Sequence, residues 1–399
     1  MVRVETLTHH GMGRLPDGTL VPRVLPGEEI ALAGDGTARI LTASPDRVAP
    51  PCRHFKSCGG CAMQHVSEDF VAAWKCGIVE TALAAQGLEA PIRRMHTSPP
   101  RSRRRARLSA RKTKKGALVG FHARASDTIV AVPDCQLLLP SLAAVLPALE
   151  QLARMAASRS TEIAFTVTDS PAGPDLRVET DRALDEGLRA DLGRFAQEQS
   201  LSRLVWGDEP IAMIAPPFQH FGMARVTPPP GAFLQATREG EAALLASVRD
   251  ALGDAGQVVD LFAGCGTFAL PLAETARVHA VEGSAPMLAA LDAGWRHATG
   301  LKPVTTEARD LFRRPLLPED LARFDAAVID PPRQGAAAQA EAIAASGLGR
   351  VAMVSCNPAT FARDARTLVA SGFRLDWVDV VDQFRWSPHA ELAALFTRS

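Results

Sequence analysis

The chain contains no tyrosine, no long hydrophobic run and no excess of either charge. No apolar stretch approaches the roughly 20 residues that a membrane-spanning helix needs. The first residues, Met1 to Thr6, lack the apolar core of a secretory signal peptide. Lys plus Arg and Asp plus Glu both number 44, which excludes a uniformly polycationic protein. We therefore expect a cytoplasmic protein of ordinary soluble composition.

Cysteine is sparse, with seven residues in the whole chain. In a reducing compartment these thiols are not expected to form structural disulfides. Each one is therefore explained by metal binding, by catalysis or by packing. Cys265, inside a glycine turn, and Cys76, on a predicted helix, are assigned to packing.

Acidic residues are missing from one long segment. Residues 91–124 hold twelve Lys or Arg residues and no Asp or Glu. A solvated basic face would normally include acids, so this cluster favours contact with the phosphates of a nucleic acid. The candidate contacts are Arg101, Arg103, Arg104, Arg105 and Arg107.

The order of turns and apolar runs predicts three units. Residues 1–47 are short β segments divided by Gly and Pro turns, as in a small β-barrel. Residues 48–233 hold a cysteine-rich segment, a helix over 67–87 and then an α+β pattern. In residues 234–399 short apolar runs alternate with helices, which predicts an α/β fold with a doubly wound, Rossmann-like sheet. The last two strands, near Trp377 and Glu391, are expected to form a hairpin.

A strand that runs into a glycine turn marks a cofactor site. The segment Asp260-Leu-Phe-Ala-Gly-Cys-Gly-Thr267 lacks the third glycine of the dinucleotide fingerprint. Its glycines, Gly264 and Gly266, let the backbone approach a ligand closely. Glu282, at the end of the next strand, can accept hydrogen bonds from both ribose hydroxyls. With Asp330-Pro-Pro-Arg further on, this form is typical of an S-adenosylmethionine methyltransferase; a nucleotide-binding fold of another kind is the alternative.

The Asp330-Pro-Pro segment alone would also suit an enzyme that methylates amines. Those enzymes commonly place an aromatic residue after the prolines, where it stacks on a flipped base. Here the next residue is Arg333, which weakens that interpretation.

Cys356 stands at the end of the apolar strand Val351-Ala-Met-Val-Ser. Open α/β folds bind their ligands at the carboxyl edge of the sheet, so this thiol is a candidate nucleophile; an inert buried thiol is the alternative. A nucleophile beside a methyl donor suggests carbon methylation of a pyrimidine, because C5 of uracil becomes nucleophilic only after addition to C6. The target base must leave its stack to reach both groups.

A base must then remove the C5 proton so that the thiolate can leave. Glu391, in Ser387-Pro-His-Ala-Glu391, is the best candidate. The alternative for Glu391 is a surface acid. His389 is expected to orient its neighbours or to stack, and not to act as the base.

Four further cysteines form a group of their own: Cys52, Cys58, Cys61 and Cys135. Four thiolates suit either a zinc ion or an iron–sulfur cluster. Their spacing does not decide between the two.

Taken together, these motifs resemble the RNA 5-methyluridine methyltransferase family, in its bacterial type that carries a [4Fe-4S] cluster and acts on 23S ribosomal RNA. The resemblance runs nearly end to end. It includes Leu25-Pro-Gly-Glu, Cys58-Gly-Gly-Cys61-x-x-Gln64-His65, Phe233-x-Gln235, Ser355-Cys-Asn-Pro and Pro388-His-x-Glu391.

The resemblance implies roles for named residues. The four cysteines of the group would hold the cluster, Cys356 would be the nucleophile and Glu391 the base. Residues 1–47 would be a TRAM domain that binds RNA, and the helix at 67–87 would pack on the catalytic domain. The expected cofactor-binding set is Gln235, Phe262, Gly264, Gly266, Thr267, Glu282, Asp310 and Asp330.

The chain also departs from the family pattern. The N-terminal segment is short, Phe384-Arg385 replaces the usual Phe-Pro, and Arg103-Arg104 stands where Tyr-Arg is common. A tRNA-methylating relative in the family lacks the cluster cysteines and the barrel, so ribosomal RNA is the favoured partner, bound by a monomer. Two rival hypotheses are a non-catalytic RNA-binding cluster protein and a zinc-containing methyltransferase of DNA or protein.

Overall fold

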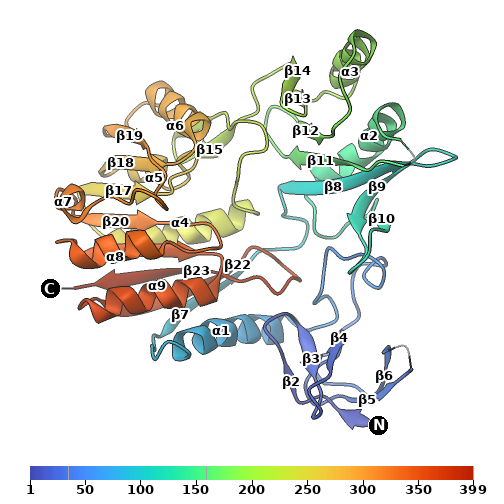
Figure 1. Cartoon of the computed structure of the whole chain (residues 1–399), viewed down its shortest axis with the longest axis horizontal. Helices are drawn as coiled ribbons and strands as arrows, with labels where there is room; N and C mark the ends of the chain where they lie inside the picture. The colour runs from blue at the N-terminus through green and yellow to red at the C-terminus, as the bar shows by residue number, and fades with distance from the viewer. Residues whose placement is uncertain (35, 159, 399) are drawn as a thin grey trace.

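Three β-rich regions follow one another in a computed structural model that describes residues 1–34, 36–158 and 160–398 (Figure 1). The N-terminal region forms two three-stranded sheets, β1-β5-β6 and β2-β3-β4, around a small apolar core. Its strands are β1 (Val2–Arg3), β2 (Thr6–Leu7), β3 (Met12–Arg14), β4 (Leu20–Pro22), β5 (Glu29–Leu32) and β6 (Ala38–Thr42).

The middle region is a seven-stranded sheet in the order β10-β9-β8-β11-β12-β13-β14. Two amphipathic helices, α2 (Pro140–Ala156) and α3 (Glu186–Glu198), bury their apolar sides against it. The strands are β8 (Arg105–Lys112), β9 (Ala117–His122), β10 (Ile129–Ala131), β11 (Ile163–Thr168), β12 (Asp175–Glu179), β13 (Arg203–Trp206) and β14 (Glu209–Met213). A short hairpin of β15 (Gln219–Phe221) and β16 (Ala224–Val226) follows and packs on helix α6 (Ala285–His297).

The C-terminal region is built on an eight-stranded mixed sheet in the order β19-β18-β17-β20-β21-β23-β22-β7. Five strands run parallel, and β23 enters antiparallel between β21 and β22. The strands are β7 (Ile92–Thr97), β17 (Gln257–Leu261), β18 (Arg277–Glu282), β19 (Val304–Ala308), β20 (Ala326–Ile329), β21 (Arg350–Ser355), β22 (Arg374–Asp382) and β23 (Glu391–Thr397).

Helices cover both faces of this sheet, because alternate strand residues are apolar on both sides. Ala326 and Val328 of β20 face one core, while Ala327 and Ile329 face the other. One face is covered by α4 (Arg238–Leu252), α5 (Ala269–Leu272) and α6 (Ala285–His297). The other is covered by α1 (Glu68–Ala84), α7 (Pro318–Leu321), α8 (Ala337–Ala345) and α9 (Pro358–Ala370). The predicted α/β fold class is confirmed, and so is the β22–β23 hairpin.

The helix predicted over 67–87 is α1, and Ser67 caps it by accepting a hydrogen bond from the Phe70 amide at 3.3 Å. It packs against α9 and lies beside β22 (Figure 1). The next strand, β7 (Ile92–Thr97), pairs in parallel with β22 and ends the C-terminal sheet. Residues 68–97 therefore lie with the C-terminal sheet, although they precede the middle sheet in the chain. The three-unit boundaries 1–47, 48–233 and 234–399 stay a prediction. No helix of the described chain is long and apolar enough to cross a membrane.

Candidate active site

The carboxyl ends of the parallel strands meet at one edge of the C-terminal sheet, and β23 begins at the same edge. Strand register decides which residues become neighbours there. Ser355, the last residue of β21, pairs with Leu392 of the antiparallel strand β23. Cys356 therefore follows directly beside Glu391, the first residue of β23. The structure thus brings together two side chains that were predicted separately from the sequence.

Burial shapes the electrostatics of both groups. It raises the pKa of the Cys356 thiol to about 11, with further increases from Glu391 and Asp330. The Glu391 side chain is 3% exposed, and burial together with Asp330 raises its pKa well above the usual value. The Arg333 guanidinium opposes both shifts. Without substrate, the Cys356 thiol is therefore protonated at neutral pH, and burial favours the neutral form of Glu391.

Cys356 is positioned by the turn that ends its strand. Asn357 caps α9, its side-chain oxygen accepting a hydrogen bond from the Ala359 amide at 3.1 Å. The Asn357 amide group donates to the Arg333 carbonyl at 2.9 Å. Pro358 occupies the first helical position, where its missing N–H costs nothing. This cap ties the cysteine turn to the turn after Asp330, so the two loops form one wall of the site.

The glycine turn after β17 was predicted to lie against a cofactor, and its two glycines differ. A Cβ on Gly266 (φ 94°) would lie 2.8 Å from side-chain atoms of Leu270 and Leu291, so core packing requires this glycine. A Cβ on Gly264 (φ 57°) would meet only the Met287 side chain, at 3.7 Å. Gly264 is therefore the position where the backbone remains open to a ligand.

Glu282 lies next to this turn, at the end of β18. Its carboxylate accepts hydrogen bonds from the amides of Gly264 at 3.1 Å and Ser284 at 2.9 Å. Phe262, which has a positive φ of 64°, places its ring centroid 5.2 Å from that of Phe312. Together these residues form an apolar and acidic surface beside the turn, and Thr267 follows it, partly buried.

Asp310 lies close to the same surface and is exposed. Its carboxylate accepts a hydrogen bond from the Phe312 amide at 3.0 Å. This contact anchors the loop that carries Phe312.

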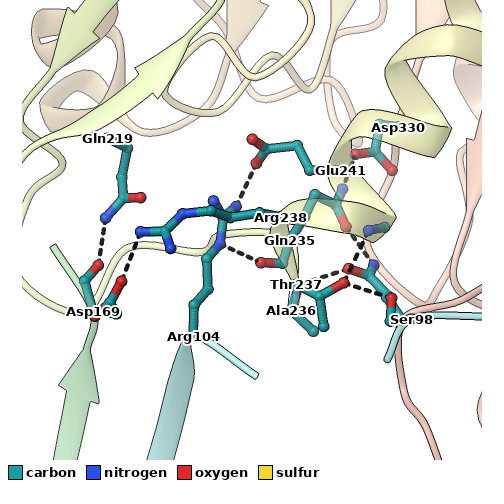
Figure 2. A network of polar contacts seen from close by, with 12 residues as sticks. Ser98, Arg104, Asp169, Gln219, Gln235, Ala236, Thr237, Arg238, Glu241 and Asp330 are labelled. Carbon is teal, nitrogen blue, oxygen red and sulfur yellow. Dashed lines mark hydrogen bonds and ion pairs between the residues drawn. The ribbon is translucent and has the colours of Figure 1, made fainter. Parts of the chain in front are cut away.

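Gln235 and Asp330 meet on the other side of the site, where the Gln235 side-chain amide donates to the Asp330 carboxylate at 3.3 Å (Figure 2). Burial raises the pKa of Asp330 to about 7. The Arg104 guanidinium holds the backbone of Gln235 in place by donating to its main-chain carbonyl at 2.9 Å, and it pairs with Glu241 (Figure 2). Arg104 is 2% exposed. The structure therefore argues against Arg104 as an RNA contact, because its charge is already neutralised inside the protein.

The other predicted RNA-binding arginines lie nearer the surface. Arg101 is exposed and donates to the Gln136 side chain at 3.0 Å. Arg103 is partly buried, above the Phe384 ring. Arg105 is partly buried and donates to a backbone carbonyl at 3.1 Å. Arg107 is exposed but forms an ion pair with a glutamate, Glu179, at 2.9 Å.

The four grouped cysteines line a common cavity with Phe55, Gln64 and Phe121. Each is partly buried, and burial raises the pKa of Cys61 to about 12. Within residues 1–34, 36–158 and 160–398, no three Cys, His, Asp or Glu side chains converge closely enough to hold one metal ion. All four thiols therefore face a shared cavity rather than separate parts of the structure.

Sequence reasoning missed two polar groups of this site. Asp260, at the end of β17, is fully buried, and neither carboxylate oxygen has a hydrogen-bond partner among the described residues. Its position before the glycine turn is visible in the sequence, but its complete burial is not. Gln383, which follows β22 and is 1% exposed, belongs to no motif. Its place directly after the strand that ends Val380-Val381-Asp382 is the one signal that could have marked it.

Comparisons with known proteins agree with this geometry. Residues 228–399 match the family model of tRNA (uracil-5-)-methyltransferases. An RNA methyltransferase of Brucella suis is 42% identical over 97% of this chain and 95% of its own length. The 23S rRNA (uracil(1939)-C(5))-methyltransferase RlmD of Halomonas elongata is 34% identical over 97% of this chain and 87% of its own. The chain belongs to the RNA uracil-C5 methyltransferase family.

This membership makes the protein an S-adenosylmethionine-dependent enzyme that methylates uracil C5 in RNA. The fold agrees with that of a solved relative. A tRNA (uracil-54, C5)-methyltransferase of Pyrococcus abyssi, in complex with S-adenosyl-L-homocysteine, superimposes with a TM-score of 0.77 over 99% of both chains at 19% identity. The sequence-based prediction of family, fold and enzyme class is confirmed.

Proposed function

We propose that this enzyme methylates C5 of a uridine in 23S ribosomal RNA, with Cys356 as nucleophile and Glu391 as general base. The observation that carries the proposal is the β21–β23 register, which sets the two side chains side by side. The choice of 23S RNA is supported by the Halomonas relative's substrate. We further propose that the enzyme acts as a monomer in the cytoplasm and that residues 1–47 help to bind RNA.

The nucleophilic step needs the thiolate of Cys356, which adds to C6 of a flipped uracil. This addition makes C5 electron-rich. S-adenosylmethionine supplies the methyl group that C5 accepts. Arg333 favours the thiolate, because it is the cation that lowers the pKa of Cys356. Binding of uracil excludes water from both side chains, which strengthens these interactions.

The final step belongs to Glu391. Its carboxylate takes the proton from C5, the electrons of that C–H bond form the C5–C6 double bond, and the C6–S bond breaks to release the Cys356 thiolate. A raised pKa suits this role, because a carboxylate that binds protons more tightly is a stronger base.

The cofactor is proposed to bind at the glycine turn. Glu282 would accept hydrogen bonds from the ribose, and Gly264 would allow close backbone approach. Phe262 and Asp310 would flank the adenine, while Gln235 and Asp330 would line the side nearest Cys356. Gly266 and Thr267 would shape the turn.

We propose that Cys52, Cys58, Cys61 and Cys135 hold a [4Fe-4S] cluster. The supporting observations are the cavity that the four thiols share and their number, since four thiolates are the usual ligand set of such a cluster. The cluster would shape the RNA-binding surface, since methyl transfer involves no redox step. Purified without oxygen, the protein should be brown and contain about four irons per chain; a colourless protein with one zinc would contradict the proposal.

The catalytic proposal is tested with RNA that carries 5-fluorouridine. Fluorine cannot leave C5 as a proton does, so the covalent enzyme–RNA adduct should persist on a denaturing gel. Cys356→Ser should form no adduct, whereas the matched control Cys265→Ser, at a buried thiol in the core, should still form it. An adduct in Cys356→Ser, or none in the wild type, would contradict the mechanism.

The choice of RNA is tested separately. Mapping of 5-methyluridine in a strain that lacks the gene should show loss of a modification in 23S RNA. Loss confined to tRNA would reassign the substrate and leave the chemistry intact.

A further inference from the structure

Gln383 lies between Glu391, the proposed base, and Gln235, which lines the proposed cofactor side of the site. It is 1% exposed and follows the last residue of β22. Its side-chain amide donates to a carboxylate oxygen of Glu391 and to the side-chain oxygen of Gln235, the latter at 2.5 Å. Gln235 in turn donates to Asp330. A continuous polar chain therefore links Glu391 to the proposed cofactor side.

The orientation of this amide is set by the backbone. The Ala236 N–H, which can only donate, lies 2.6 Å from the Gln383 side-chain oxygen. That contact fixes which end of the amide is oxygen, a choice otherwise left to the surrounding network. The NH2 end consequently faces Glu391 and Gln235, both of which present oxygen acceptors.

The first turn of α4 is shaped to admit this side chain. A Cβ on Gly240 would lie 2.6 Å from the Gln383 Cβ. The Gly240 amide donates at 2.9 Å to the side chain of Thr237, the residue that caps α4. The helix start and Gln383 are thus packed in direct contact, which leaves the amide little freedom to turn.

We infer that Gln383 is a positioning residue that holds Glu391 for removal of the C5 proton. Its donor occupies Oε2 of Glu391, while no hydrogen bond of the described residues engages Oε1. Oε1 is then the oxygen that accepts the proton from C5, with the C5–H electrons forming the C5–C6 double bond and the C6–S bond breaking. The inference rests on the proposed roles of Cys356 and Glu391.

An amide donor also favours the ionised carboxylate, because a hydrogen bond to the charged form stabilises it. Gln383 thereby offsets part of the burial that disfavours the base. Without this donor, addition of the thiolate and methyl transfer can still proceed, but proton removal slows. The methylated covalent adduct should then accumulate on ordinary uridine RNA.

The test follows both events in one single-turnover experiment. The RNA carries tritium at C5 of uridine, and the methyl donor carries carbon-14. Wild type should release tritium as fast as it incorporates methyl. In Gln383→Met, tritium release should lag methyl incorporation by about ten- to a hundredfold, as for loss of a hydrogen bond to a charged group, and a covalent adduct should appear on a denaturing gel.

Two further variants separate positioning from simple damage. Gln383→Glu keeps an acceptor for the Ala236 amide but sets a second carboxyl against Glu391, so the rising limb of tritium release should move to higher pH. Gln339→Met is the matched control. Gln339 is equally buried and lies on α8, and its side chain bonds to the backbone of Leu316 and not to the proposed site residues, so its two rates should stay equal.

The outcomes separate this inference from the function on which it rests. Equal slowing of methyl incorporation and tritium release in both Gln383 variants, without an adduct, would overturn the positioning role. Failure of the wild type to incorporate methyl or to release tritium would instead overturn the proposed function.

Discussion

At the scale of single residues, Cys356 meets two opposing demands. The nucleophile must be a thiolate, yet burial and the neighbouring Glu391 raise its pKa to about 11. An enzyme with this arrangement keeps its thiol protonated until the substrate arrives. Protection from oxidation and from alkylation follows from the same burial, because the thiolate is the reactive form.

The first prediction concerns the alkylation of Cys356 by iodoacetamide in the free enzyme. A raised pKa means that the thiol is protonated throughout the neutral range, so the rate should rise about tenfold per pH unit from neutral pH until it levels off near the pKa. Glu391→Gln removes a group that raises this pKa, so alkylation at a given pH should be faster in that variant. Mass spectrometry of the peptide that contains Cys356 measures both rates.

Cys356→Ala serves as the control, since the labelled peptide should then be absent. A rate in the wild type that is already constant at neutral pH would contradict the prediction. So would slower alkylation in Glu391→Gln.

Residues at a strand boundary on the reactive edge could be proposed as site residues from the sequence alone, because a strand boundary and a chemical motif coincide there. Cys356 and Glu391 are of this kind. The burial of Arg104 could not be predicted, because a run of arginines has the same sequence pattern whether a given side chain faces water or the interior. Gln383 escaped notice because its role depends on contacts with residues distant in the chain, chiefly Gln235 and Ala236.

At the scale of elements, helix α1 links the cysteine segment to the loop before the proposed base. Lys75 of α1 is fully buried and pairs with Asp382 at 2.6 Å. Its ammonium also donates to the His389 carbonyl at 2.7 Å. The amides of Ala62 and Met63, just after Cys61, both donate to the Trp386 carbonyl. The loop is therefore held by the helix and by the cysteine segment together.

The second prediction concerns the buried pair of Lys75 and Asp382. Lys75→Met leaves the Asp382 carboxylate buried without its partner, which should lower the free energy of unfolding by about 3–5 kcal/mol. Urea denaturation followed by circular dichroism measures the loss. Because the same lysine holds the His389 carbonyl, methyl transfer should fall as well.

A second variant shows whether the effect arises from the unpaired charge. Lys75→Met combined with Asp382→Asn removes that charge and should regain part of the lost stability. A loss below about 1 kcal/mol in Lys75→Met, the size expected for an exposed pair, would contradict the prediction.

Helices and strands could be predicted where a cap or an apolar pattern within the element itself marks them. The cap at Ser67 marked the start of α1, and short apolar runs marked the parallel strands of the C-terminal sheet. The placement of β7 was not predictable in this way. It pairs with β22, which lies at the other end of the chain, and pairing between such distant segments leaves no periodic trace in either one.

At the scale of the whole molecule, net charge does not show which arginines are paired with acids and which remain free to bind RNA. The chain is formally neutral, yet several arginines of the basic segment are neutralised internally. Arg104 pairs with Glu241, and Arg107 pairs with Glu179. Arg101 is exposed, and its hydrogen-bond partner, Gln136, is uncharged. Its positive charge therefore remains available to a phosphate.

The third prediction concerns the salt dependence of RNA binding. Each phosphate contact contributes about 0.7 to 0.9 to the slope of log affinity against log salt. Arg101→Gln should therefore lower that slope by close to one contact and weaken binding across RNA sequences alike. Arg107→Gln should have a smaller effect, because Glu179 already compensates this charge. Filter binding between about 50 and 200 mM salt measures the slopes.

Arg323→Gln is the matched control for this titration. Arg323 is exposed but precedes β20, at the amino-terminal edge of the C-terminal sheet, opposite the proposed site. The slope of log RNA affinity against log salt in Arg323→Gln should equal that of the wild type. An equal change of slope in Arg323→Gln and Arg101→Gln would contradict the prediction, because RNA affinity would then depend only on net charge. A change confined to Arg101→Gln would place an RNA phosphate near Arg101. That phosphate would lie beside the cysteine cavity, because Arg101 bonds to Gln136, the residue after Cys135.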